Sequence, residues 1–357
     1  MGGELPCCDS ITPPAPPLAL SPDGSEFAAT TGASTVGVFS TETLKRVASF
    51  TLRPSNNAIT ALAWSPIGGT LAVGAHAGVV QLWDVSGAPR LERSLTGLSP
   101  FLGQNESVEA LAFSPDGQLL AASDKSEGAA LGRNVVSPIA MLARWNVSTG
   151  AMVGMPASLG AGGNGSDVLA FSSDGKLLAA SLLTGGVRIF DPSNGRVLRT
   201  FADPGAETTS LAFAPKGSLL AAGTFEGTVE MWDPITGKLL AAPLVADSTG
   251  IADLAFDPSG QRFATTGLQD GDVKVWFTGS LEREGPPLAT DSGATAAEAF
   301  EPGGRGLLVF DDVGGAFSWP MSLRTWEQRA CSLADRNLTR EEWTQFAAGG
   351  RYTTVCR

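Results

Sequence analysis

The sequence predicts an all-β protein built from seven similar units that close into a ring. Three observations carry this prediction. A short phrase of the type Leu-Ala-Phe-Ser-Pro-Asp-Gly recurs along the chain, an aromatic residue follows each copy at a nearly fixed distance, and the intervening segments have the alternation and turn residues of short strands. The units occupy residues 18–320 of the 357-residue chain, between an N-terminal segment (1–17) and a C-terminal tail (321–357).

The first phrase opens each unit. Its apolar triplet is typical of a strand, and the Ser-Pro-Asp-Gly that follows in the stronger copies is typical of a tight turn, because Pro fixes φ and Gly completes the turn. The last residues of successive triplets lie 42 to 58 positions apart. The seven copies occupy residues 18–24, 62–68, 111–117, 169–175, 211–217, 254–260 and 298–304.

An aromatic residue marks the third strand of each unit. It follows the last residue of the triplet by 19 positions in five units and by 20 in the sixth, whereas the third unit has 32 and so carries 13 extra residues. Two phrases held in register seven times identify one repeated structural unit. We expect these structural aromatics to fill the gaps between units: Phe39, Trp83, Trp145, Phe190, Trp232, Trp276 and Trp319.

Four strands fit within each unit. The second strand is rich in small apolar residues, as in 119–123, and a tight glycine turn stands five residues before most of the aromatics. The third strand alternates with a period of two, as in 227–232. The fourth is more polar, as in 195–201, which suits an outer edge where Arg and Lys discourage pairing with other chains.

These features resemble the WD-repeat β-propeller family, whose Trp-Asp dipeptide is present at 83–84 and 232–233. The resemblance implies a seven-bladed β-propeller of four-stranded antiparallel blades around a central channel. Many members carry a Gly-His dipeptide before the first strand, and its histidine bonds within the blade. No unit here has that dipeptide, and the single histidine, His76, is expected at the tight turn of the second unit.

The two ends extend the repeat array. We expect residues near 4–11 to supply the outer strand of the seventh blade, with 321–326 as the alternative. The tail predicts two short helices, 322–334 and 339–348, the second opened by a capping box from Thr339 to Glu342. It resembles a tail found in bacterial WD-repeat proteins. Cys331 and Cys356 are expected as reduced thiols, although a link between them stays open.

Composition narrows the function classes. The net charge of −12 disfavours nucleic acid and anionic membranes as partners. A single histidine excludes a pair of catalytic histidines and a multi-histidine metal site, so we expect no catalytic residues, no metal and no cofactor.

No apolar run long enough for a bilayer and no secretory signal are visible, so a cytoplasmic location is expected. Few lysines beside abundant Ala, Gly and Arg hint at a bacterial source.

Two regions are candidate binding sites. The first comprises residues of the tight turns and of one preceding connection, most of them acidic: Glu207, Phe225, Glu226, Asp270, Asp311 and Asp312. Phe225 is either exposed as an anchor for a partner or buried against the next blade. The second is the insertion of the third unit, with Lys125, Glu127 and Arg133. A solvated acidic rim and a tolerated surface insertion are the alternatives.

The sequence therefore favours a non-catalytic protein-interaction scaffold that binds a protein or peptide, which the acidic turns suggest is basic. A regulatory propeller that controls a separate bacterial signalling enzyme or NTPase is the second hypothesis. An enzyme that uses the central channel is the third, and the sequence offers it no metal-ligand spacing.

Overall fold

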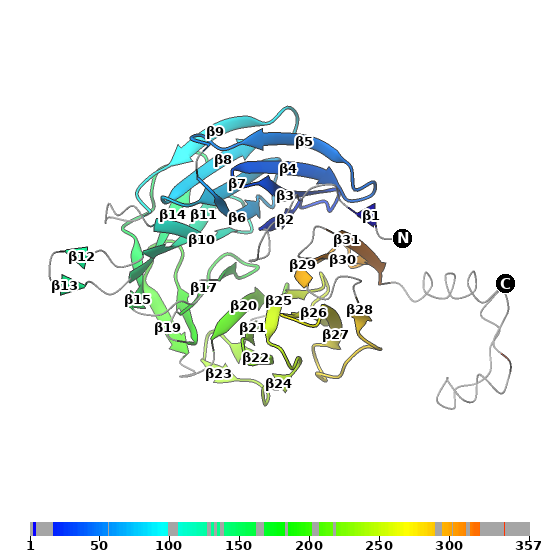
Figure 1. Ribbon diagram of the computed structural model, residues 1–357. Coiled ribbons are helices and arrows are strands. Elements are labelled where there is room, and N and C mark those ends of the chain that lie inside the picture. The colour runs from blue at the N-terminus through cyan, green and yellow to red at the C-terminus, as the bar shows by residue number, and fades with distance from the viewer. Residues whose placement is uncertain are drawn as a thin grey trace.

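The computed structural model has seven antiparallel sheets of four or more strands set around a ring, which confirms the predicted seven-bladed propeller (Figure 1). The structure describes residues 3–4, 17–55, 57–98, 106–126, 130–131, 134–135, 139–161, 168–182, 185–201, 207–216, 219–289, 295–301, 303–311, 315–321 and 339. Within these residues no helix could span a bilayer. The helices expected in the C-terminal tail and Cys331 and Cys356 lie outside the described residues.

Each of the first four blades contains four antiparallel strands in simple up-and-down order. The first blade has β2 (Leu18–Leu20), β3 (Glu26–Gly32), β4 (Thr35–Ser40) and β5 (Arg46–Thr51). The second has β6 (Ile59–Trp64), β7 (Thr70–Ala75), β8 (Val79–Asp84) and β9 (Arg90–Leu95). The third has β10 (Glu106–Phe113), β11 (Leu119–Ser126), β14 (Ile139–Asn146) and β15 (Ala157–Ala161). The fourth has β16 (Leu169–Phe171), β17 (Leu178–Ser181), β18 (Val187–Phe190) and β19 (Val197–Phe201).

The remaining blades depart from this pattern at their outer edge. The fifth has β20 (Thr208–Phe213), β21 (Leu220–Thr224) and β22 (Thr228–Asp233), and its outer strand is split into β23 (Lys238–Leu239) and β24 (Leu244–Val245). Pro243 stands between the two pieces and has no N–H to donate to the ladder. The sixth has β25 (Ile251–Phe256), β26 (Arg262–Gly267), β27 (Asp272–Phe277) and a short β28 (Leu288–Ala289).

The seventh blade takes strands from both ends of the array. It contains β29 (Thr295–Phe300), β30 (Gly306–Asp311) and β31 (Gly315–Pro320), and β1 (Gly3–Glu4) pairs antiparallel with the outer side of β31 (Figure 1). The insertion of the third blade contains β12 (Ala130–Leu131) and β13 (Asn134–Val135), which pair with each other as a separate sheet.

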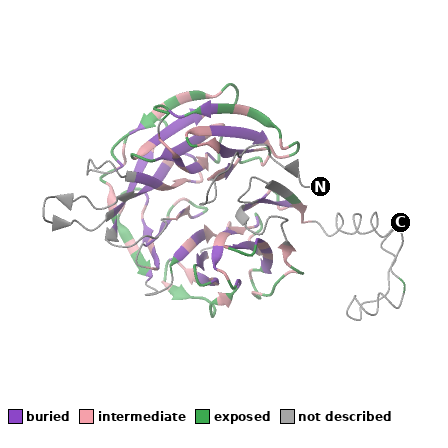
Figure 2. Cartoon of the chain, viewed as in Figure 1, coloured by how far each residue is buried: buried purple, intermediate pink, exposed green. Residues whose placement is uncertain are grey.

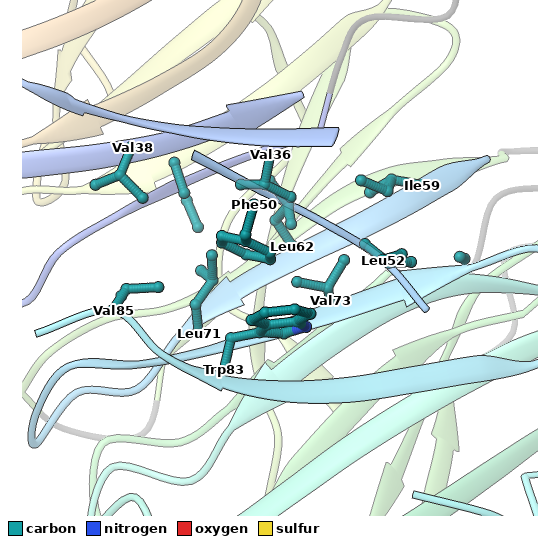
Figure 3. Close-up of a cluster of buried hydrophobic side chains, with 13 residues drawn as sticks. Val36, Val38, Phe50, Leu52, Ile59, Leu62, Leu71, Val73, Trp83 and Val85 are labelled. Carbon is teal, nitrogen blue, oxygen red and sulfur yellow. The ribbon is translucent and has the colours of Figure 1, made fainter. Parts of the chain in front are cut away.

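The core lies between neighbouring blades, because each sheet covers the face of the next. Buried residues concentrate on the inner and middle strands and exposed ones on the outer strands (Figure 2). At the first junction, Phe50 of β5 stacks on Trp83 of β8 with ring centroids 4.2 Å apart, among Val36, Leu71 and Val73 (Figure 3). Small residues such as Ala72 keep the second strand narrow near the ring centre.

The Ser-Pro-Asp-Gly turns use their aspartates structurally. Asp23 Oδ1 accepts hydrogen bonds from Ser21 Oγ at 2.7 Å and from the Ser25 backbone N–H at 3.0 Å, and these bonds lower the pKa of Asp23. Gly24 closes the turn at φ 71°. Asp116 and Asp174 accept equivalent bonds in the third and fourth blades. These carboxylates stabilise turns.

Candidate functional site: the tight turns of the fifth and sixth blades

The tight turn between β21 and β22 presents an aromatic ring beside two carboxylates. Phe225 is 55% exposed, which excludes the alternative that it is buried against the next blade. Glu226 follows it in the turn and is also exposed. The Phe225 backbone N–H donates to the carbonyl oxygen of Glu207 at 2.9 Å, so the exposed Glu207 lies beside the same turn. The structure therefore brings Glu207, Phe225 and Glu226 together.

Glycine allows this turn to form. Gly227 has φ +84° and donates its N–H to the Thr224 carbonyl oxygen at 3.0 Å. The Gly227 carbonyl oxygen accepts bonds from the N–H groups of Ala246 and Asp247 at 2.9 and 3.0 Å. The turn is thus attached to the connection that leads into the sixth blade. Its backbone holds Phe225 in place without burying the ring.

The tight turn of the sixth blade lies directly beside that of the fifth. A Cβ atom on Gly250 would stand 2.6 Å from the Phe225 carbonyl oxygen and would collide with Leu268, which precedes the sixth-blade turn. The Leu268 N–H also donates to the Gly250 carbonyl oxygen at 3.0 Å. Asp270 is exposed on this second turn, where its Oδ1 accepts the Asp272 N–H at 3.1 Å. We call Glu207, Phe225, Glu226 and Asp270 the acidic turn surface.

A buried ion pair lies beneath this surface. The Lys274 ammonium donates to Asp247 Oδ2 and stands 3.6 Å from Asp270 Oδ2. Asp247 Oδ1 accepts from the N–H and hydroxyl of Thr249 at 2.8 and 2.7 Å. Burial alone would raise the pKa of Asp247, but the bonds from Lys274 and Thr249 together lower it. Lys274 is thus held by two carboxylates, and among the described residues no ion pair reaches Glu207 or Glu226.

The other predicted binding residues are placed only in part. Asp311 ends β30, where it pairs with Thr295 of β29. Lys125 lies on β11, paired with Ser107 of β10. Asp312, Glu127 and Arg133 lie outside the described residues. The acidic turn surface therefore rests on residues of the fifth and sixth blades.

Three of the blade tryptophans donate hydrogen bonds to side chains that were not predicted from the sequence. The Trp83 indole N–H donates to Gln81 Oε1 at 3.1 Å, and the Trp232 indole N–H donates to Glu230 Oε2 at 3.1 Å. The Trp276 indole N–H donates to Thr265 Oγ1 at 3.0 Å. Gln81, Glu230 and Lys274 share one position, two residues before the tryptophan. A polar residue at this position of the alternating third strand is the signal that could have found them. Phe39, Trp83, Trp145, Phe190 and Trp276 are buried, whereas Trp232 and Trp319 are half-buried.

One other feature could serve a ligand. A recess of about 430 Å³ lies between the first and second blades, lined by Phe50, Leu52, Trp83 and Pro89 with the loop 53–55. Within the described part of the chain, no group of three or more His, Cys, Asp or Glu residues is arranged to hold a metal ion. The recess shows little accessible aromatic surface, since Phe50 and Trp83 stack on each other.

Comparison with known families agrees with the fold. The WD40 family model (WD domain, G-beta repeat) matches residues 46–84, 96–126, 195–233 and 238–276. The first and third matches each run from the outer strand of one blade to the third strand of the next. With the seven-bladed architecture, these repeats support a place in the WD-repeat propeller family. No curated protein matches the chain significantly.

Proposed function

We propose that this chain, a seven-bladed propeller with WD40 repeats, is a non-catalytic protein-interaction scaffold that binds a basic peptide segment on the acidic turn surface. The observation that carries the proposal is the exposed Phe225 side chain, which lies beside the exposed Glu207 and Glu226 and next to the turn that carries Asp270. WD40 propellers commonly serve as interaction scaffolds, which supports the class of function.

The chemistry of the surface fits a cationic side chain. A guanidinium or ammonium group is attracted to the face of an aromatic ring, and flanking carboxylates add charge-assisted hydrogen bonds. Exposed aromatics are also the residue type that most often dominates an interface. A basic segment would satisfy both features at once. The second proposal is a regulatory propeller of a bacterial signalling system in the cytoplasm. Such a propeller would bind its partner through the same surface.

The test is binding of defined fluorescent peptides, Arg- and Lys-rich against neutral and acidic peptides of equal length. The variant Glu207→Gln/Glu226→Gln/Asp270→Asn should bind the basic peptides about tenfold more weakly than the wild type, because three exposed carboxylates each contribute about 0.2–1 kcal/mol. Phe225→Ala should weaken binding by a similar factor.

The control removes the same number of charges elsewhere. Glu42, Glu92 and Glu282 are exposed and lie outside the acidic turn surface, so Glu42→Gln/Glu92→Gln/Glu282→Gln should bind as the wild type does. An equal loss of affinity in the two triple variants would mean that net charge alone attracts the peptide. A wild type without preference for basic peptides would remove the proposal.

A further inference from the structure

A glutamate replaces leucine at a core position of the seventh blade. Glu298 is the first residue of the triplet on β29, and it is only 4% exposed. The structure packs β29 against β25 and β26 of the sixth blade. The other six units carry a leucine at this position: Leu18, Leu62, Leu111, Leu169, Leu211 and Leu254.

A second carboxyl group lies across the blade junction. The Glu298 backbone N–H donates to Asp253 Oδ2 at 3.2 Å, and the Leu254 N–H donates to Asp253 Oδ1 at 2.8 Å. The Asp253 N–H in turn donates to Thr266 Oγ1 at 3.0 Å. Both carboxyl oxygens of Asp253 therefore accept backbone hydrogen bonds, an arrangement that stabilises the ionised form.

The side chain of Glu298 has the opposite environment. Its two carboxyl oxygens are buried, and no hydrogen bond of standard geometry reaches either of them from the described residues. Burial raises the pKa of Glu298 well above its ordinary value, the charge of Asp253 adds to the effect, and the hydroxyl of Thr266 offsets only part of it. Burial also raises the pKa of Asp253, against its two amide bonds.

The charged residues described on the neighbouring strands do not compensate the pair. On β26, Arg262 pairs with Asp257 at 3.4 Å and Glu284 at 3.5 Å. On β27, Lys274 is held by Asp247 and Asp270, and Asp272 is a further acid. β30 contributes Val309 opposite Glu298. Two ionised carboxylates at this junction would therefore repel each other in a site of low polarity.

We propose that Glu298 and Asp253 share a single proton, carried by Glu298, and that loss of this proton opens the junction between the sixth and seventh blades. The asymmetry of the hydrogen bonds decides which group is protonated, because two backbone N–H groups donate to the Asp253 carboxyl, whereas no hydrogen bond of standard geometry reaches the Glu298 carboxyl from the described residues. With the proton in place, Glu298 is a neutral group that can pack where its counterparts are leucines. Without it, the innermost strands of two blades carry adjacent negative charges. The junction thus responds to rising pH, independently of the partner-binding surface.

The sign of the pH dependence follows from linkage. A group whose pKa is raised in the folded state contributes full stability at low pH, and this contribution is lost as the pH rises through the folded-state value. Between the unfolded-state and the folded-state pKa of Glu298, the folding equilibrium constant should fall by up to about tenfold per pH unit relative to a variant that cannot ionise, and above the folded-state value it should fall no further.

Urea unfolding of the full chain from about pH 4 to about pH 9 tests this. Glu298→Gln is isosteric with the protonated acid, so it should unfold like the wild type at low pH and become progressively more stable than it at high pH. Glu298→Leu, the residue of the other blades, provides a second non-ionising variant should Gln disturb folding. Glu109→Gln changes a half-buried glutamate on the innermost strand of the third blade, and it should follow the wild type throughout.

Hydrogen exchange locates the effect. At high pH, peptides from β25 and β29 should exchange faster in the wild type than in Glu298→Gln at the same pH, whereas peptides from β16 should not differ. Identical pH profiles for wild type and both Glu298 variants would overturn the proposal. A midpoint that rises with Ca²⁺ and falls with a chelator at constant pH would also overturn it, since a cation rather than a proton would then neutralise the pair.

Discussion

Buried polar side chains connect neighbouring blades in this propeller, whose units lack the histidine of the Gly-His dipeptide. Gln81 of the second blade donates through Nε2 to the Arg53 carbonyl oxygen at 2.5 Å, in the connection from the first blade, and accepts the Trp83 indole N–H. Lys274 makes the corresponding contact in the sixth blade through Asp247. Each polar group satisfies a partner that would otherwise be buried unpaired, so losing one member costs more than the bond itself.

Lys274→Met should destabilise the propeller strongly. Asp247 is almost fully buried, and removing its cation leaves a buried carboxylate without its ion-pair partner, a change that costs about 3–5 kcal/mol. Urea unfolding at neutral pH measures this. Lys176→Met is the matched control, because Lys176 pairs with Asp174 on the surface and its loss should cost less than about 1 kcal/mol.

The same pair has a defined pH dependence. The pKa of Asp247 is lowered from 3.8 in the folded state, so its contribution is present above that value and is lost as the pH falls through the lower folded-state value. The wild type and Lys274→Met should therefore converge in stability below pH 3.8. Equal costs for the two lysine substitutions at neutral pH would show that Lys274 is not a buried partner.

Single residues were the hardest scale to predict from the sequence. The exposed Phe225 and its acidic neighbours could be proposed because they occur within one turn or at the same turn of the next unit. Contacts such as Lys274 to Asp247 join a strand to a connection 27 positions away in the sequence, and no local sequence pattern predicts them. Glu298 was visible as a departure from the triplet, but its relation to Asp253 depends on how β29 lies beside β25.

At the scale of elements, glycine turns determine how the second and third strands meet. The register of each blade brings its aromatic opposite a fixed residue of the second strand, as Trp232 faces Leu220 and Trp276 faces Phe263. The sequence predicted these pairs well because the turn residues and the aromatic recur at constant spacing. It predicted the outer strands of the fifth and sixth blades less well, since the prolines near them break the ladder without altering the repeat.

Gly227→Ala should destabilise the fifth blade and displace the Phe225 turn. An added Cβ would collide with the Asp247 carbonyl oxygen, which is backbone and cannot rotate away, and the residue would remain at φ +84°. We expect a loss above about 2 kcal/mol, from the collision added to about 1–2 kcal/mol of left-handed strain. Thermal unfolding measures the loss, and the same variant should lose affinity for basic peptides.

Gly285→Ala separates the two contributions. Gly285 has φ +74°, but a Cβ atom there would meet no atom within 4 Å. Its cost should therefore be the strain alone, about 1–2 kcal/mol, with peptide binding unchanged. If both glycine variants lost the same stability, the close approach of Asp247 to the turn would be unimportant.

For the whole molecule, ring closure explains why weak repeats form one stable structure. No blade can bury both of its faces alone, and each hydrophobic cluster combines residues of two adjacent blades, as in the cluster that joins Phe27 and Phe39 of the first blade to Phe310 of the seventh. The seven-fold phrase therefore predicted the global fold more securely than any individual contact. The insertion of the third blade does not disturb this arrangement, since β12 and β13 pair with each other.

The net charge of −12 surrounds the acidic turn surface with a negative electrostatic field, which adds to the attraction of a basic peptide. Basic peptides should associate faster and bind more tightly at low salt, and affinity should fall steadily from about 50 to about 500 mM NaCl as the field is screened. The variant Glu207→Gln/Glu226→Gln/Asp270→Asn should show a shallower dependence, because it lacks the local carboxylates but keeps most of the distant charge. Phe225→Ala should keep the wild-type slope at lower affinity, since the ring adds contact without formal charge. An affinity that stayed constant with salt would instead assign binding to Phe225 and apolar contact alone.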